Sequence, residues 1–311
     1  MATLRETKDR IGSVRSTLKI TSAMKLVASA KLRKAQKAIE GMRPYERTLA
    51  EILSAVGPAA KFPQRADVNY FSDKSAEKPI SDSPSTTPTH FAAGKTAIVA
   101  IASNSSLCGA FNANVIKKAL ETARGCEGEV EVIPVGRKMA DALRRAGYTD
   151  AADFNDLIGH PSYEQSAALA RSLSERFLAG ELSRVVLVYN RFISSARQEP
   201  VAETYLPFEN TNLSSAEKSN SDPSFAEEDD YIIEPDAETL LASLLPQVMM
   251  LKFHAAILDS AAAEHAARTI AMQTASDNAE ELLGELTLEY NKGRQQKITA
   301  EILDLLGGTA Q

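Results

Sequence analysis

The sequence predicts an α/β fold in which a central Rossmann-like domain lies between two long terminal helices that pair as an antiparallel coiled coil. Three observations support this fold: a heptad pattern over residues 4–56, a helical pattern with few breakers over residues 236–306, and alternating strands and helices between them. We therefore expect five segments along the chain. They are an N-terminal coiled-coil helix (1–57), a polar loop (58–94), the α/β domain (95–208), an acidic linker (209–235) and a C-terminal coiled-coil helix (236–311).

The N-terminal stretch carries two rows of mostly apolar residues, spaced alternately by three and four positions, as in the seam of a coiled coil. One row is Leu4, Ile11, Leu18, Lys25, Leu32, Ile39, Glu46 and Leu53; the other is Thr7, Val14, Thr21, Ala28, Ala35, Met42, Leu49 and Val56. The polar members weaken the seam, and the pattern alone fits an amphipathic helix on an ordinary core equally well. Length favours the coiled coil, because a second long helix stands at the other end of the chain.

The C-terminal stretch is a helix rich in small residues. Ten of the 25 residues from Ala255 to Ala279 are alanine, the strongest helix former. An apolar stripe at 3–4 spacing runs through Ala261, Met272, Ala275, Ala279, Leu282, Leu286, Tyr290, Ile298, Ile302 and Leu305. About 70 residues of helix would span roughly 100 Å. Such a helix needs a partner helix, and we expect a partner protein as well.

The middle of the chain alternates between strand and helix patterns. Strands are predicted at 96–102, 130–135, 184–189 and 199–206, and helices at 111–124, 137–146 and 162–178. Asn112 is a plausible cap of the first of these helices. Pro200 favours an edge position for the last strand, because proline cannot donate to a central ladder. The order predicts a small sandwich with a largely parallel sheet.

Charge is unevenly distributed along the chain. Residues 1–47 hold 12 Lys or Arg against 4 Asp or Glu, a balance of +8, which leaves −14 for the remainder of a chain whose net charge is −6. A basic helix of this kind fits an acidic partner or is simply a solvated face. We expect no membrane span, because no run of 18 apolar residues occurs. We expect no secretory signal, because the N-terminus is charged and heptad-patterned and has no apolar h-region. Cys108 and Cys126 are expected to be reduced thiols.

The sequence does not describe an active site. Gly94-Lys95-Thr96 looks like the end of a phosphate loop, but Thr89 stands where that motif needs glycine, and the tripeptide precedes a strand instead of following one. The four histidines are scattered, and His265 lacks a His-Glu-x-x-His context, so no metal is expected. A lone buried thiol is the favoured interpretation of Cys108. We expect no cofactor and no catalytic residue.

Three stretches resemble one family, the gamma subunit of the F-type ATP synthase. They are residues 20–36 (ITSAMKLVASAKLRKAQ), residues 107–112 (LCGAFN), and the run 264–302 with Ala266-Ala267-Arg268, Asp277-Asn278-Ala279, Tyr290-Asn291 and residues 294–299 (RQQKIT). Ile233-Glu234-Pro235 adds to the likeness, which covers the chain outside the two polar segments. The loop 102–106 (ASNSS) departs from the Asp-Arg-Gly type common in the family, and Asp304 stands where Glu is common.

The resemblance implies a non-catalytic rotor shaft that couples proton flow to ATP synthesis or hydrolysis. Its partners would be three alpha and three beta subunits, the epsilon subunit and the membrane c-ring, with the protein peripheral to the cytoplasmic face of the bacterial inner membrane. The implied contact and coupling residues are Met24, Lys25, Arg268, Arg294, Gln295, Thr299 and Glu301.

Two other classes of function stay open at this point. A basic coiled-coil scaffold would bind nucleic acid or anionic lipid with steep salt dependence. A nucleotide-dependent enzyme built on the α/β domain would bind nucleotide saturably by itself.

Overall fold

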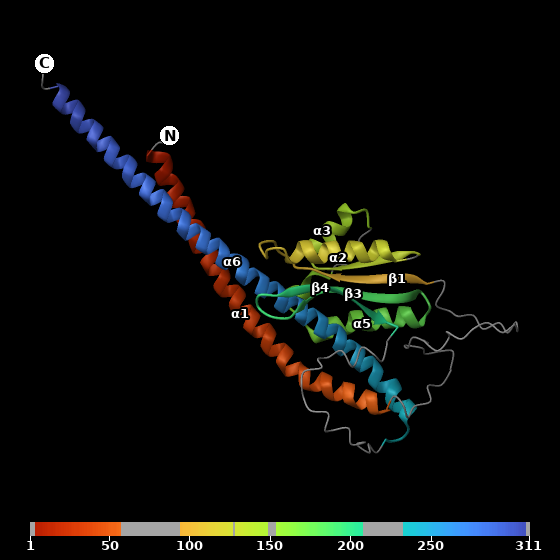
Figure 1. Ribbon diagram of the computed structural model, residues 1–311. Helices are drawn as coiled ribbons and strands as arrows, with labels where there is room; N and C mark the ends of the chain where they lie inside the picture. The colour runs from red at the N-terminus through yellow and green to blue at the C-terminus, as the bar shows by residue number, and fades with distance from the viewer. Residues whose placement is uncertain (1–3, 57–93, 127, 149–153, 208–232, 309–311) are drawn as a thin grey trace, which may run out of the picture.

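The computed structural model describes residues 4–56, 94–126, 128–148, 154–207 and 233–308. Two long helices, α1 (Leu4–Val56) and α6 (Ala237–Gly308), lie side by side and antiparallel, and the α/β domain is attached to one side of this pair (Figure 1). The start of α1 and the end of α6 point away from the domain on the same side, and α6 extends further than α1. The predicted fold class and the pairing of the terminal helices are confirmed. Most of the two polar segments at 58–94 and 209–235 falls outside the described residues.

The predicted heptad seam is the buried face of α1. Seam positions from Leu4 to Leu53 are buried or partly buried, whereas most positions between them are exposed. Even the polar member Thr21 is buried, and its Oγ1 lies 2.8 Å from Oγ of Ser276 on α6, within hydrogen-bonding distance. A buried hydroxyl pair of this kind favours one register of the two helices, because sliding one helix would take this partner from Ser276, while Thr21 would keep its hydrogen bond to the carbonyl of Leu18.

The sheet has four strands in the order β2-β1-β3-β4. Strand β1 (Lys95–Ile101) pairs in parallel with β2 (Val130–Val135) and with β3 (Leu182–Phe192), while β4 (Gln198–Leu206) runs antiparallel to β3 at the edge. The largely parallel sheet and the edge position of the last strand are both as predicted. Burial on both faces explains why the sequence of β1 reads as a continuous apolar run.

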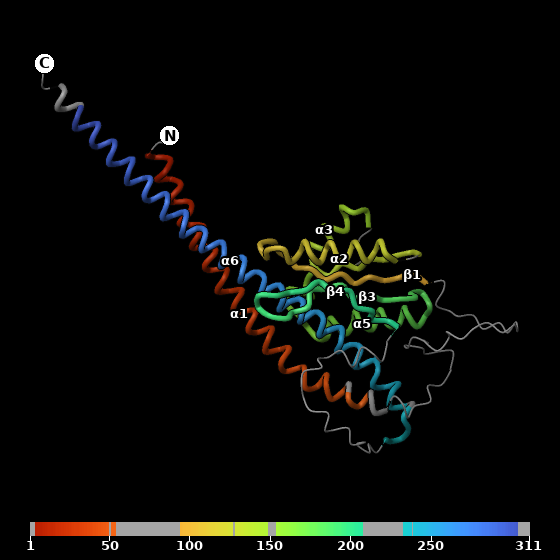
Figure 2. The backbone as a smooth tube through the Cα atoms, in the orientation of Figure 1, coloured from red at the N-terminus to blue at the C-terminus, as the bar shows by residue number. Residues whose placement is uncertain are grey.

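Helices cover both faces of the sheet, but one face is covered in part by the long helix itself. Helices α2 (Phe111–Gly125) and α3 (Arg137–Arg145) pack on one face. Helix α5 (Tyr163–Leu178), the short α4 (Asn155–Gly159) and α6 pack on the other. The sequence did not indicate α4. Figure 2 shows α6 passing beside α5 along the sheet before it continues beyond the domain.

Helix α6 belongs to two cores at once. Toward the sheet and α5 it places Leu245, Met249, Phe253, Ala256, Ile257 and Ala261. Toward α1 it places Leu241, Val248, Leu251, Leu258, Ala262 and Ala266. By length and composition α6 is apolar enough to cross a membrane, within Thr239–Leu303 and with mean hydropathy 1.5, but half of that window is buried inside the protein. The two cores account for this apolarity.

Three local predictions differ from the structure. Helix α2 begins at Phe111, and Asn112 lies inside its first turn, so Asn112 is not the cap. Leu282 is 44% exposed, because Leu283 lies nearer the seam at this point of the 3.6-residue repeat. Ile298 and Ile302 are also exposed, because α1 does not extend that far along α6.

The start of α6 is as predicted. Asp236 precedes the first residue of the helix, and its carboxylate accepts hydrogen bonds from the backbone N–H and the hydroxyl of Thr239, at 2.7 and 2.8 Å. This is the contact of a helix-capping aspartate, which satisfies a backbone donor that the helix itself cannot reach.

Candidate functional site

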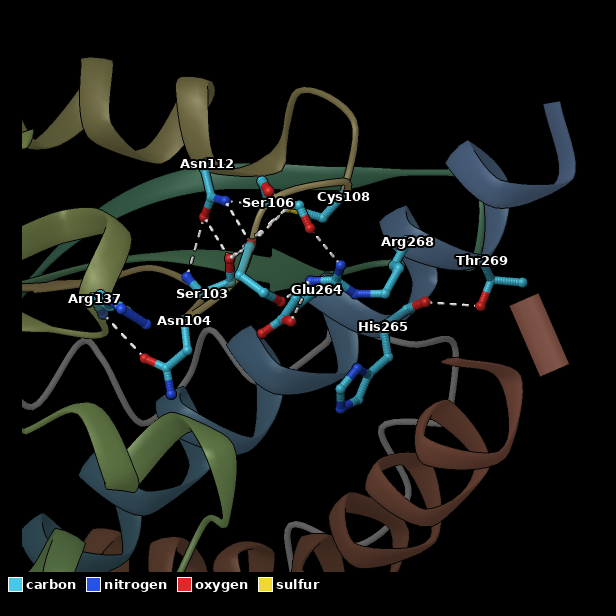
Figure 3. Close-up of polar contacts among 11 residues, drawn as sticks. Ser103, Asn104, Ser106, Cys108, Asn112, Arg137, Glu264, His265, Arg268 and Thr269 are labelled. Carbon is cyan, nitrogen blue, oxygen red and sulfur yellow. Dashed lines mark hydrogen bonds and ion pairs between the residues drawn. The ribbon is translucent and has the colours of Figure 1, made fainter. Parts of the chain in front are cut away.

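The first candidate site is at the carboxyl end of the parallel strands. Strand β1 lies between β2 and β3, so the chain leaves β1 at the point where the strand order reverses. Open α/β domains bind ligands in the crevice at this point. In this protein residues 102–110, which follow β1, lie at this point against one turn of α6 (Figure 3).

Polar groups in this loop are bonded within the chain. The side-chain oxygen of Asn112 accepts hydrogen bonds from the backbone N–H and the hydroxyl of Ser103, at 3.1 and 2.9 Å. Its amide nitrogen donates to Sγ of Cys108 and to the carbonyl of Ser105. Asn104 accepts from the backbone N–H of Arg137 at 3.0 Å. Cys108 is buried, as predicted. The side chains of Ser103, Asn104 and Asn112 therefore brace the loop from inside.

Arg268 of α6 contacts the loop that follows β1. Its guanidinium donates to the hydroxyl of Ser105 at 2.9 Å and to the carbonyl of Ser106, and it pairs with Glu264 at 2.8 Å (Figure 3). The side chains of Arg268 and Glu264 are only 15% and 10% exposed. Burial raises the pKa of Glu264, and the hydrogen bond from Arg268 opposes that rise. The candidate Arg268 thus ties the loop to the long helix.

His265, on the same turn of α6, faces away from the loop, and burial lowers its pKa to about 4, helped by the charges of Lys31 and Arg268, so it is neutral near pH 7. Within the described residues, no cluster of three or more His, Cys, Asp or Glu side chains could hold a metal. Gly94 lies where an added Cβ would stand 2.6 Å from the backbone nitrogen of Ser183, so this glycine serves close packing.

A second candidate surface lies along the outer face of α1. Met24 is 40% exposed, and Ile20 and Val27 lie on the same face, one turn away on either side. Lys25 belongs to the seam and is partly buried, so the structure separates it from Met24. Exposed apolar side chains clustered on one face of a helix are typical of a surface that another protein covers.

Met24 and Arg268 lie near each other along the coiled coil. Thr21 stands opposite Ser276, so Met24 lies near the level of residue 273 on α6. Arg268 is five positions from that level, an offset of roughly 7.5 Å along the axis. The two candidates therefore belong to one zone, where the coiled coil leaves the α/β domain.

The third candidate surface is the tip of α6. Leu4, at the start of α1, packs against Gly293 of α6. A Cβ added at Gly293 would lie 3.2 Å from Cδ2 of Leu4. Beyond this contact α6 continues alone to Gly308, over roughly 22 Å. The candidates Arg294, Gln295, Thr299 and Glu301 all lie on this part and are exposed.

Contacts at the tip are local. The hydroxyl of Thr299 donates to the carbonyl of Gln295 at 2.9 Å, and Glu301 pairs with Lys297 at 3.7 Å across an exposed turn. Ile298, Ile302 and Leu303 are exposed beside them. Exposed branched residues on an uncovered helix end suit packing by another chain.

Comparison with known proteins gives consistent matches over the whole chain. A family model described as ATP synthase matches residues 3–310. The ATP synthase gamma chain of Bacteroides fragilis is 46% identical over 313 aligned residues, which cover 99% of each chain. The ATP synthase gamma chain of Flavobacterium johnsoniae is 38% identical and covers 99% of this chain and 98% of its own.

Solved structures show the same fold. The rotor of the Euglena gracilis mitochondrial ATP synthase aligns with a TM-score of 0.58 at 19% identity, over 95% of this chain and 98% of that one. The central stalk and c-ring structure of the Tetrahymena thermophila mitochondrial ATP synthase gives 0.53 at 22% identity, over 83% and 99%.

Proposed function

This chain belongs to the ATP synthase gamma-chain family, and we propose that it is the central rotor shaft of an F-type ATP synthase. In this role it couples proton flow through the membrane sector to ATP synthesis or hydrolysis on the beta subunits. The observation that carries the proposal is the end-to-end match to gamma chains at 46% identity. The shape fits the role, because a stiff helix pair extends away from a domain at one end and leaves a bare helix at the other.

The proposed shaft does not catalyse by itself. Support comes from the carboxyl ends of the strands, where Arg268 and the side chain of Asn112 bond to the loop after β1. A nucleotide would have to displace these contacts, including a guanidinium already paired with a buried carboxylate. ATP is then made or hydrolysed on the surrounding subunits, and this chain supplies only the movement.

The proposed partners are three alpha and three beta subunits around the coiled coil, and the epsilon subunit and c-ring at the α/β domain. The chain is a peripheral subunit of a membrane-bound complex, with the cytoplasmic face of the inner membrane as its proposed location. The exposed tip of α6, with Ile298 and Ile302, suits burial inside a sleeve of other subunits. The basic outer face of α1 suits acidic loops on the beta subunits.

The candidate residues have separate proposed roles. Met24 contacts a beta-subunit loop, because it is exposed at the level where the coiled coil leaves the domain. Arg294 and Gln295, with Thr299 and Glu301 one turn further, contact the sleeve near the tip. Arg268 acts within the chain, since its guanidinium is already bonded. Lys25 supports the seam next to Met24.

The test is the native mass and subunit composition of the complex that a tagged copy of this chain brings out of detergent-solubilised membranes. One copy of this chain with three alpha and three beta subunits is the expected result. A monomer, or a complex with nucleic acid or with lipid alone, would contradict the proposal and support the scaffold alternative instead.

A further inference from the structure

A cluster of charged groups lies where the edge of the sheet meets the long helix, outside the candidate surfaces above. Its centre is Glu203 on β4. One carboxylate oxygen of Glu203 accepts a hydrogen bond from the hydroxyl of Tyr189 at 3.1 Å and pairs with Arg191 at 3.3 Å. The other oxygen pairs with Nζ of Lys252 on α6 at 3.1 Å. Glu203 therefore joins the sheet to the helix through both of its oxygens.

The groups of this cluster are held in the charged states that the contacts need. Burial acts to raise the pKa of Glu203, but Lys252 and Arg191 outweigh it and lower that pKa, so Glu203 is ionised at neutral pH. Burial and the nearby carboxylate raise the pKa of Tyr189, so its hydroxyl stays protonated and donates. The side chains of Lys252 and Glu203 are only 20% and 24% exposed, which limits screening by solvent and salt.

Directional contacts matter at this interface because the apolar ones do not fix an angle. Met249, Phe253 and Ile257 of α6 pack against the sheet side of the domain, and such packing resists separation more than a small rotation. Charged hydrogen bonds have preferred distances and directions. Such links join the domain to α6 at Lys252 and at Arg268, 16 residues or roughly 24 Å apart along the helix.

We propose that Glu203 is a positioning residue that sets the angle of the α/β domain about α6 through Lys252, so that rotation of the domain and of the shaft stay in phase. The inference rests on the proposed function and assigns the mechanical joint within it. Arg268 and Lys252 are the two charged links of this contact, and hydrogen bonds from Tyr205 to the carbonyl of Met249 and between Ser166 and His254 lie beside Lys252. Loss of either charged link lowers the stiffness of the contact against rocking.

The experiment measures the angular fluctuation of the domain in single rotating complexes. The full chain is assembled with alpha and beta subunits, and the complex is attached to a surface through the beta subunits. A bead is fixed to Lys117→Cys, on the exposed side of α2, in a Cys126→Ser background. The angular variance is recorded during the pauses of ATP-driven rotation, together with the hydrolysis rate.

The variants are Glu203→Gln and Lys252→Met, which remove the charge and keep most of the side-chain volume. We expect each to raise the angular variance about twofold, because one of two charged links is lost and variance is inverse to stiffness. Lys252→Arg keeps a charged donor and is expected to stay near the original variance. The control, Glu129→Gln, breaks the exposed pair with Lys95 inside the domain and is expected to change nothing.

The outcomes separate the inference from the function on which it rests. Broadening in Glu203→Gln and Lys252→Met, with recovery in Lys252→Arg, supports the joint. Rotation with the same variance in all variants overturns it and leaves the shaft intact. Broadening in Lys252→Arg to the level of Lys252→Met also overturns it, because packing alone would then explain the effect. A complex that never rotates contradicts the proposed function and the joint together.

Discussion

Asp259 lies next to this joint and gives a prediction about pH. It is on the partly buried side of α6 and faces Arg191 of β3 and Arg43 of α1, with Glu46 and Glu203 also near. Burial raises its pKa from 3.8 to about 6; the two arginines oppose the rise and the two glutamates add to it. The perturbation is Asp259→Asn, which keeps the shape and removes the titration.

The sign follows from the direction of the shift. Between pH 3.8 and 6 the folded chain holds a proton on Asp259 that the unfolded chain has lost, so stability falls as pH rises through this window. At 1.36 kcal/mol per pKa unit, the ionised carboxylate costs about 3 kcal/mol at pH 8 and about 1.5 kcal/mol at pH 5. Asp259→Asn removes this cost, so its stabilising effect grows by about 1.5 kcal/mol between the two pH values.

The assay is urea unfolding of the full chain, followed by circular dichroism, at pH 5 and pH 8. The matched control is Glu285→Gln on the exposed side of the same helix, which should stay within about 0.5 kcal/mol of the original chain at both pH values. A gain in stability that is the same at both pH values would contradict this prediction, since it would show that ionisation of Asp259 costs nothing in the folded state. If Asp259→Asn were less stable than the original chain at pH 8, attraction to the two arginines would outweigh the cost of burying the carboxylate.

Three further predictions concern the seam, the loop and the outer face of α1. Thr21→Val should lower the free energy of unfolding by roughly 1–3 kcal/mol, because it leaves the hydroxyl of Ser276 buried without this partner. When Ser276→Ala is added, urea unfolding should show a smaller loss of stability than the sum of the losses in the two single variants. Arg268→Ala should lower the free energy of unfolding by roughly 3–5 kcal/mol, because Glu264 then stays buried without its cation. It should also speed hydrogen exchange at Ser105 and Ser106, because the loop loses its bonds to Arg268. Unchanged exchange would show that the loop does not depend on Arg268. Met24→Lys should add a holding contact of ~1 kcal/mol or more with acidic partner groups, so that ATP hydrolysis continues while fewer protons are pumped per ATP. An unchanged ratio in vesicles would rule this contact out.

The coiled coil could be predicted from the sequence because its signal is periodic and local. The seam of a coiled coil repeats every 3.5 residues whatever the partner helix is. Each seam position from Leu4 to Leu53 therefore supports the same prediction. Thr7 and Thr21 weakened the apolar pattern, yet both are buried. The hydroxyl of Thr21 meets Ser276 of the facing helix, which the sequence of one helix alone does not show.

The charged and polar contacts could not be predicted, because they join residues far apart in the chain. Arg268 meets Ser105 across 163 positions, and Lys252 meets Glu203 from another element. The sequence around Arg268 or Lys252 does not show whether the side chain bonds to another part of the chain or is solvated. Asn112 was misassigned for the same reason: an asparagine near a helix start fits a cap, but here a strand-end loop nine positions earlier offered better partners.

The tip of α6 shows what periodicity cannot say about partners. The apolar stripe continues through Ile298 and Ile302 with the same spacing as in the seam, but α1 begins opposite Gly293 and covers neither residue. A 3.6-residue repeat predicts that one face of the helix is buried, but it does not tell which chain covers that face. The expectation that this helix needs a partner protein therefore came from its length, which exceeds that of α1.

The sharing of α6 between two cores limits how the protein can move. Rotating α6 away from α1 would expose Leu258 and Ala262, and the same rotation would drag Phe253 and Ile257 out of the domain core. Because both faces of one rigid helix are buried, neither interface can slip alone without an apolar cost in the other. Torque applied at the domain is then carried into α6 directly, and α1 follows through the seam and its register pair, Thr21 and Ser276. The small adjustments that remain are rotations about the helix axis, which is the motion that the contact between Glu203 and Lys252 opposes.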